Sequence, residues 1–274
     1  MLRSYLAVGC DMTIVVEDLW KSYGNMQVLK GLNLEVYKGE TVVILGQSGV
    51  GKSVLLRQII GIERPDRGHV AVDGNIISSL QGPDLYKAIK NMGMLFQGSA
   101  LFDSMTVAEN TAFYLQQHGQ PDTGQPLSKA EIRERVGEAL AMVGLEGSED
   151  KMPSDLSGGM RKRAALARLI VYRPRILLYD EPTTGLDPIT AMHINELIIK
   201  TQQELNATSI VVTHDIRSAL EVGDRLALHH NGTLEVIAKK EDFFSEDNIL
   251  VKSFLNNVTL MGLSKQKKRA KKSL

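Results

Sequence analysis

The chain has 274 residues, with 32 basic and 32 acidic side chains that leave a formal net charge of zero at pH 7. Hydrophobic residues make up 43% and charged residues 23%, which is ordinary for a globular cytosolic protein with a sizeable core. No uninterrupted apolar run approaches the ~20 residues needed to cross a bilayer. The single cysteine, Cys10, excludes an internal disulfide and suits a reducing compartment.

The first strand is predicted to begin at Thr13, so residues 1–12 are expected to form an extension ahead of the folded domain. Within this extension, the stretch from Leu6 to Cys10 faintly resembles a lipoprotein cleavage site. The apolar segment before that site is too short for a signal peptide. A loose extension, or translation that starts at Met12, is the favoured interpretation.

A phosphate-binding loop follows the apolar run Thr41–Leu45, which is typical of a buried parallel strand. The loop matches the pattern G-x-x-x-x-G-K-[ST], and a helix from Lys52 to about residue 60 is predicted to point its positive end at the same place. We expect Lys52 to reach the β- and γ-phosphates of a nucleotide and the Ser53 hydroxyl to bind Mg²⁺. The predicted nucleotide-binding residues of the loop are Gly46, Gln47, Ser48, Gly49, Val50, Gly51, Lys52 and Ser53.

A helical subdomain is predicted after this loop, over about residues 98–173. Ser128 and Glu131 have the spacing of a capping box that opens a helix. Val136 and Leu140 recur at helical spacing after it and give the helix one apolar face, which is most simply internal core.

A second short motif consists of Leu156, Ser157, Gly158, Gly159 and Met160. The Ser157 hydroxyl can cap a helix, and the two glycines open a predicted helix that runs to about Val171. This motif is therefore a second helix start that is suited to bind an anion.

Two predicted strands end in polar side chains. Asp180 and Glu181 follow an apolar strand, at the carboxyl end where ligands bind in open α/β sheets. We expect Asp180 to hold Mg²⁺ through water and Glu181 to act as general base on an attacking water. His214 ends the strand that starts at Ser209, and we expect it to contact the γ-phosphate, although a lone histidine is more often structural.

The C-terminal part is predicted to consist of a closing hairpin, a short helix and a basic tail. Asn231 and Gly232 lie between apolar segments and indicate a hairpin that closes the domain near residue 240. Residues 241–274 are predicted to hold a short amphipathic helix, over 249–258, and a basic tail. Without the six basic side chains of the tail the chain has a charge of −6. A solvated tail is slightly favoured over attraction to an anionic membrane, and no nucleic-acid recognition motif accompanies it.

These motifs together resemble the nucleotide-binding subunit of an ATP-binding cassette (ABC) transporter over about residues 13–238. The resemblance implies an α/β fold: a phosphate-loop ABC ATPase core, which is a RecA-like mixed sheet with flanking helices and an antiparallel β subdomain, plus an inserted α-helical subdomain. It also implies roles for three further residues. Tyr23 stacks on adenine, Gln97 touches Mg²⁺ and reports to the membrane partner, and Asp187 crosses a dimer interface.

The resemblance further implies a twofold homodimer, in which the signature segment of one chain, residues 156–160, covers the phosphate loop of the other. ATP and Mg²⁺ then lie between the copies. The commonest signature of the family is LSGGQ, whereas this chain has Met160. The implied phosphate contacts come from Ser157 and the backbone of Gly158 and Gly159, so ATP binding is expected to survive.

A finer resemblance concerns the residues around Gln97, the signature segment and the acidic pair, which are similar to those in ATPases of Mla-type lipid-transport systems. It implies a peripheral ATPase on the cytoplasmic side of the bacterial inner membrane, with integral-membrane permease subunits and an MCE-domain lipid-binding protein. Such systems move phospholipids or related lipids between the inner and outer membranes. The alternative is an importer ATPase for amino acids or another polar solute. A non-transport ABC protein or a phosphate-loop kinase fits less well, and a small regulatory subunit is left open.

Overall fold

The strand that precedes the phosphate loop lies inside a six-stranded sheet. The computed structural model describes residues 12–121, 123–243 and 249–254. The strand order is β10-β9-β3-β8-β7-β6, and each neighbouring pair is parallel except β10 with β9. The strands are β3 (Thr41–Leu45), β6 (Met92–Leu95), β7 (Ile176–Asp180), β8 (Thr208–Thr213), β9 (Arg225–His230) and β10 (Thr233–Lys239).

A second sheet, with the order β2-β1-β4-β5, is antiparallel throughout. Its strands are β1 (Met12–Tyr23), β2 (Met26–Tyr37), β4 (Arg67–Val72) and β5 (Asn75–Ile76). Apolar side chains of this sheet, of helix α1 (Lys52–Ile59) and of one face of the six-stranded sheet form a single core cluster. The antiparallel sheet thus covers the phosphate-loop side of the central sheet.

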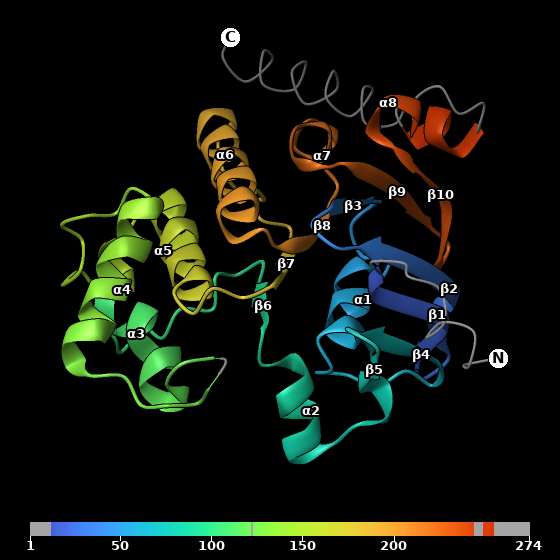
Figure 1. Cartoon of the computed structure of the whole chain (residues 1–274). Helices are drawn as coiled ribbons and strands as arrows, with labels where there is room; N and C mark the ends of the chain where they lie inside the picture. The colour runs from blue at the N-terminus through green and yellow to red at the C-terminus, as the bar shows by residue number, and fades with distance from the viewer. Residues whose placement is uncertain (1–11, 122, 244–248, 255–274) are drawn as a thin grey trace, which may run out of the picture.

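The remaining helices pack mainly against the other face of the central sheet or beyond its β6 edge. Figure 1 shows α3, α4 and α5 grouped at the side of the molecule away from the antiparallel sheet. These helices are α2 (Gly82–Ile89), α3 (Val107–His118), α4 (Lys129–Met142), α5 (Gly158–Ile170), α6 (Pro188–Leu205), α7 (Ile216–Val222) and α8 (Lys240–Phe243), with short 3₁₀ turns at Ile77–Ser79 and Pro153–Asp155.

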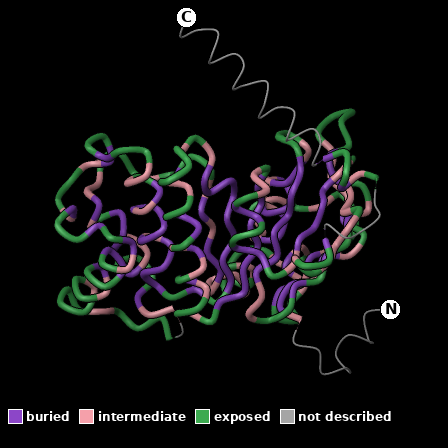
Figure 2. The backbone as a smooth tube through the Cα atoms, turned by 90° about the horizontal axis from the view of Figure 1, so that it is seen from above, coloured by how far each residue is buried: buried purple, intermediate pink, exposed green. Residues whose placement is uncertain are grey.

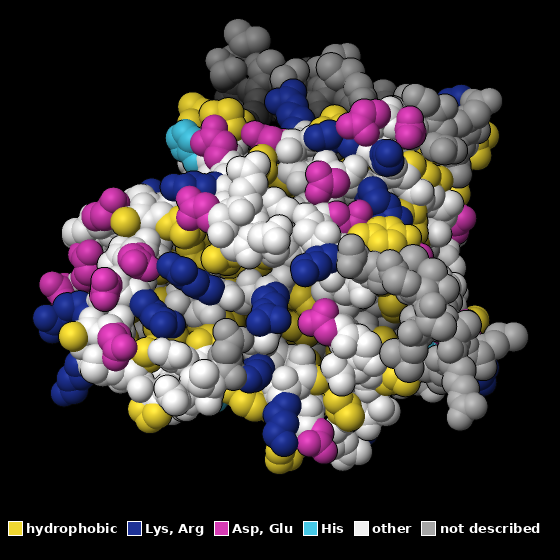
Figure 3. Space-filling model, in the orientation of Figure 1, with side chains coloured by type: hydrophobic (Ala, Val, Ile, Leu, Met, Phe, Trp, Pro, Cys, Tyr) yellow, Lys and Arg dark blue, Asp and Glu magenta, His cyan; other side chains and the backbone are white. Residues whose placement is uncertain are grey.

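Burial explains why the central strands read as unbroken apolar runs. Every residue of β3, β7 and β8 is buried, as expected for parallel strands that are covered on both faces. Val43 and Leu45 point into one core cluster, whereas Val42 and Ile44 point into the other. The same buried layer runs through the middle of the molecule in Figure 2. On the face in Figure 3, hydrophobic side chains lie among polar and charged ones, which is normal for a globular surface.

The predicted local structure is largely confirmed. Helix α4 begins with the predicted capping box, in which the Glu131 N–H donates to Ser128 Oγ (3.2 Å) and the Ser128 N–H donates to Glu131 Oε2 (2.8 Å). The hairpin between β9 and β10 turns at Asn231 and Gly232. Strand β1 starts at Met12, one residue earlier than predicted, because Met12 still pairs with Tyr37 of β2.

The C-terminal prediction is tested in part. Residues 249–254 are helical, and two apolar side chains of this segment are buried, Val251 at 1% and Phe254 at 9% exposure. The rest of the predicted amphipathic helix and the basic tail lie outside the described residues, as does the extension before Met12. Among the helices of the described part, none has the length and apolar character to span a membrane.

Candidate nucleotide-binding site

The phosphate loop joins the buried end of β3 to the start of α1. Two of its glycines are required by close contacts. A Cβ atom on Gly46 would lie 2.9 Å from the carbonyl oxygen of His229, and one on Gly51 would lie 2.6 Å from Val28 Cγ1. Gly51 also has a φ of +109°, a backbone conformation that side chains other than hydrogen disfavour. The loop is therefore wedged against β9 and β2, which fixes its shape.

Lys52, the first residue of α1, turns back into this loop. The residue is 4% exposed, and Nζ donates to the carbonyl oxygens of Gly46 (2.8 Å) and Gln47 (2.9 Å). Nζ also lies 3.3 Å from Glu181 Oε1. Burial lowers the pKa of Lys52, while the carboxylates of Glu181 and Asp180 oppose that shift. The result is a buried ammonium group in the concave side of the loop, in reach of an anion.

Ser53 and Asp180 meet although they are 127 residues apart in the chain, because β7 ends beside the start of α1. The Ser53 hydroxyl donates to Asp180 Oδ1 at 2.7 Å. Burial raises the pKa of Asp180, and the neighbouring Glu181 charge adds to this, whereas the Ser53 hydrogen bond lowers it. A hydroxyl and a carboxylate are oxygen ligands of the kind that Mg²⁺ prefers. In the described residues no cluster of three or more His, Cys, Asp and Glu side chains could hold a metal ion.

Glu181 is held by both its backbone and its side chain. It has a φ of +47°, and its N–H donates to the carbonyl oxygen of Val212 at 2.9 Å. Its Oε2 accepts from Thr184 Oγ1 (2.9 Å) and lies 2.8 Å from His214 Nδ1. Burial acts to raise the pKa of Glu181, but the His214 hydrogen bond and the Lys52 charge outweigh it, so the pKa is lowered. Glu181 is therefore a carboxylate at neutral pH, held by three partners.

His214 is paired to Glu181 from the end of β8. The hydrogen bond to Glu181 raises the pKa of His214 above its ordinary value of 6.5, although partial burial opposes the shift. A raised histidine pKa stabilises the fold fully below pH 6.5 and loses that effect as pH rises through the folded pKa. A lowered glutamate pKa stabilises the fold above pH 4.5 and loses that effect as pH falls through the folded pKa.

The thermal stability gap between the wild type and the His214→Gln variant is therefore expected to be widest between pH 4.5 and 6.5 and to narrow as pH rises above 6.5. Thermal unfolding across a pH series measures it. In a Glu181→Gln background the same histidine change should show no such pH dependence, because the carboxylate partner is gone. A gap that stays constant with pH would contradict the ion pair.

Tyr23 and Gln97 line the same cavity as the phosphate loop, Glu181 and His214, a space of about 340 Å³. Tyr23 is 45% exposed, and its hydroxyl donates to Glu63, which also accepts from Arg57 Nε at 2.7 Å. Sequence reasoning did not single out Glu63 or Arg57, because no local pattern marks a partner 40 residues away. Thr184 belongs to the motif that ends at Asp187, but the sequence does not indicate that its hydroxyl donates to Glu181.

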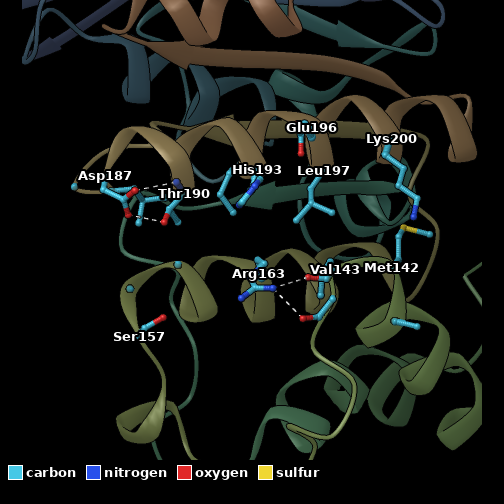
Figure 4. A pocket seen from close by; sticks show the side chains of 17 residues that line it. Met142, Val143, Ser157, Arg163, Asp187, Thr190, His193, Glu196, Leu197 and Lys200 are labelled. Atoms are coloured by element: carbon cyan, nitrogen blue, oxygen red, sulfur yellow. Dashed lines mark hydrogen bonds between the residues drawn. The ribbon is translucent and has the colours of Figure 1, made fainter.

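The signature segment lies in a different cavity. Ser157 caps α5 and accepts from the Met160 N–H at 3.2 Å, while Met160 packs against the core. Asp187 caps α6 in the same way, because its Oδ1 accepts from the N–H groups of Ile189 and Thr190, each at 3.1 Å. Figure 4 shows Ser157 and Asp187 on either side of a gap between α5 and α6, a cavity of about 700 Å³.

These two cavities share no lining residue. The structure therefore brings Tyr23, Gln97, Asp180, Glu181 and His214 to the phosphate loop, but it does not bring residues 156–160 or Asp187 there. One chain therefore carries these two groups of residues in separate cavities.

Fold and site together define a phosphate-loop nucleotide hydrolase. The sequence profile of the family described as "ABC transporter" matches residues 29–184, more than half of the chain, and the chain belongs to this family. Its relatives include the "Probable ribonucleotide transport ATP-binding protein mkl" of Mycobacterium tuberculosis, 40% identical over 261 residues, which are 94% of this chain and 71% of that protein. The "Sulfate/thiosulfate import ATP-binding protein CysA" of Pseudomonas putida is 37% identical over 254 residues, 92% of this chain and 75% of that one.

Solved structures agree with this assignment. The ABC cassette MJ0796, in a dimeric post-hydrolysis state bound to ADP and phosphate, has a TM-score of 0.75 and 34% identity, and the match covers 83% of this chain and 98% of that one. The protein cbiO1 of Clostridium perfringens, part of the ABC transporter complex cbiONQ, has a TM-score of 0.77 and 32% identity, with 93% and 99% covered. The predicted ABC ATPase fold is confirmed, and the chain is an ATP-binding, ATP-hydrolysing motor subunit of a transporter.

Proposed function

We propose that two copies of this chain bind two ATP molecules head to tail, with the phosphate loop of each copy facing the signature segment of the other. The observation that carries this proposal is the separation of the two half-sites into cavities without a common residue. Each half-site is built as an anion site, one on the loop before α1 and one at the start of α5. A twofold arrangement completes both at once. The dimeric state of the MJ0796 cassette supports the proposal.

Within each composite site, the roles follow from the contacts. Lys52 is placed to exchange its carbonyl partners for the β- and γ-phosphates. Ser53 and Asp180 would hold Mg²⁺, with Gln97 at the edge of the same cavity, and that ion supplies positive charge to the phosphate oxygens. Tyr23 offers a face for adenine, steadied by its hydroxyl bond to Glu63.

Glu181 takes the proton of the attacking water in this proposal, because its carboxylate is ionised, buried and beside Lys52. His214 fixes the orientation of Glu181 through Nδ1 and lies at the mouth of the cavity, where a γ-phosphate would come. From the facing copy, Ser157 and the backbone N–H groups of Gly158 and Gly159 contact the same phosphate, and Asp187 lies at the interface.

For the cargo, we propose phospholipids or related lipids, moved by a permease and an MCE-domain protein at the bacterial inner membrane, with this chain bound peripherally on the cytoplasmic side. The amino-acid sequences around Gln97, the signature segment and the acidic pair resemble those of Mla-type ATPases, and this resemblance supports the lipid cargo. The names of the relatives mkl and CysA, which refer to ribonucleotide and to sulfate or thiosulfate, favour a polar-solute importer as the second candidate.

A pull-down of the tagged chain from native membranes in mild detergent separates the two cargo candidates. Mass spectrometry of the eluate identifies every co-purified protein and lipid, and membranes that carry the untagged chain set the background. We expect a multi-helix permease, an MCE-domain protein and enriched phospholipid. A permease that arrives with a polar-solute-binding protein, and without lipid enrichment, would overturn the lipid assignment and leave the motor intact.

A further inference from the structure

The loop that follows Gln97 has an unfavourable backbone conformation. Ser99 and Ala100, neither of them glycine, have φ values of +66° and +49° in succession. Such residues persist only where their surroundings hold them. Within the loop itself, the Ser99 N–H donates to the carbonyl oxygen of Phe96 at 2.9 Å. The position of the Gln97 side chain in the nucleotide cavity therefore depends on whatever holds this loop from outside.

Helix α5 holds the loop with two cations. Lys162 Nζ donates to the carbonyl oxygen of Gln97, and Arg168 Nη1 donates to the carbonyl oxygen of Ala100 at 2.8 Å. The Arg168 guanidinium also lies over the Phe102 ring, 5.2 Å from its centroid. Both ends of the loop are thus bound to the helix that begins at the signature segment.

Of these two cations, Lys162 is the more deeply buried. It is 5% exposed and lies on α5, two residues past the signature segment. Burial lowers its pKa, and the negative charges of Asp180 and Glu181 oppose that shift, which places the ammonium in the field of both carboxylates. Lys162 therefore connects the signature helix to the Gln97 backbone, with its positive charge near the acidic strand end.

We propose that Lys162 is a positioning residue, which fixes the Gln97 backbone beside Asp180 and Glu181 and makes Gln97 move as one body with the signature helix. The inference rests on the proposed place of Gln97 at the Mg²⁺ site. A change at the signature segment, which faces the other copy, then reaches Gln97 of the same chain through the Lys162 ammonium group. The alternative is that Lys162 only donates a hydrogen bond to the carbonyl oxygen of Gln97 and has no effect on the Mg²⁺ site.

Steady-state ATPase assays over a Mg²⁺ titration distinguish these two hypotheses. The variants assayed are Lys162→Met, Lys162→Arg, Arg168→Met and Gln97→Ala. Affinity for a fluorescent ATP analogue without Mg²⁺ is measured in parallel. We expect Lys162→Met to raise the half-saturating Mg²⁺ concentration about tenfold, as when a group that orients a metal ligand is lost, with metal-free nucleotide affinity unchanged. Lys162→Arg should restore most of the Mg²⁺ response, because it keeps a charged donor.

Arg168→Met serves as the structural comparison, since it loosens the same loop at Ala100 and not at Gln97, and Lys87→Met on the exposed surface of α2 serves as the control. Thermal unfolding shows whether each variant folds, and Lys162→Gln, which keeps a neutral donor, replaces Lys162→Met if that variant does not. Equal losses in Lys162→Met and Arg168→Met, without a shift in the Mg²⁺ response, would overturn the proposal. If Gln97→Ala leaves the Mg²⁺ response unchanged, Gln97 is not at the Mg²⁺ site, and the proposal for Lys162 is then also wrong.

Discussion

Replacing Glu181 with Gln is expected to lower the kcat of ATP hydrolysis about 10²- to 10⁴-fold, the usual effect of losing a general base. The amide keeps the size of the side chain and can still accept from Thr184, but it cannot take a proton. ATP binding should remain, because Lys52 keeps its position in the phosphate loop and loses only an ionic partner 3.3 Å away. The variant should therefore bind ATP and accumulate as an ATP-bound dimer.

Size-exclusion chromatography with and without Mg²⁺ and ATP, together with phosphate release, measures both effects. Glu138→Gln is a matched control, because Glu138 is an exposed glutamate that pairs with Arg173 and lies outside the nucleotide cavity. If Glu181→Gln kept a third or more of the wild-type rate, the base would have to be another group. His214, whose imidazole contacts Glu181 through Nδ1, would then be the first candidate.

The parts of the site that the sequence predicts are those with a local pattern. The phosphate loop and the acidic strand end can each be recognised from a few consecutive residues, since backbone geometry and strand polarity dictate their spacing. Gln97 and Tyr23 carry no such pattern. They follow from family resemblance alone, and the structure places both in the nucleotide cavity.

The parts that escape the sequence are contacts between distant segments. The ion pair of Lys52 with Glu181 and the bond from Lys162 to Gln97 depend on how α1, α5 and β7 pack together. A lysine in the middle of an amphipathic helix is usually read as solvent-exposed, yet Lys162 is 5% exposed. Long side chains can reach buried partners from a helix edge, so charge patterning misplaces them.

The separation of the two half-sites leads to the second large effect, which is complementation between defective chains. In a Glu181→Gln background, a Lys52→Ala chain has a damaged phosphate loop and an intact signature, and a Ser157→Arg chain has the reverse. In a homodimer of either chain, both composite sites contain one damaged half. In the mixed dimer, one site combines the two intact halves and the other combines the two damaged ones.

Each chain alone is therefore expected to stay monomeric with Mg²⁺ and ATP, whereas an equal mixture should form dimers that contain one ATP. Sedimentation velocity with radiolabelled ATP measures both quantities. Thr106→Ala is the matched control, because it removes the cap of α3, at a cost of about 1 kcal/mol, without touching either half-site. If the Ser157→Arg chain dimerised alone, the signature would have no part in the interface. If the mixture stayed monomeric under conditions in which Glu181→Gln chains pair, the two half-sites could not complete each other, and the cavities between α5 and α6 and beside α1 would have to work independently.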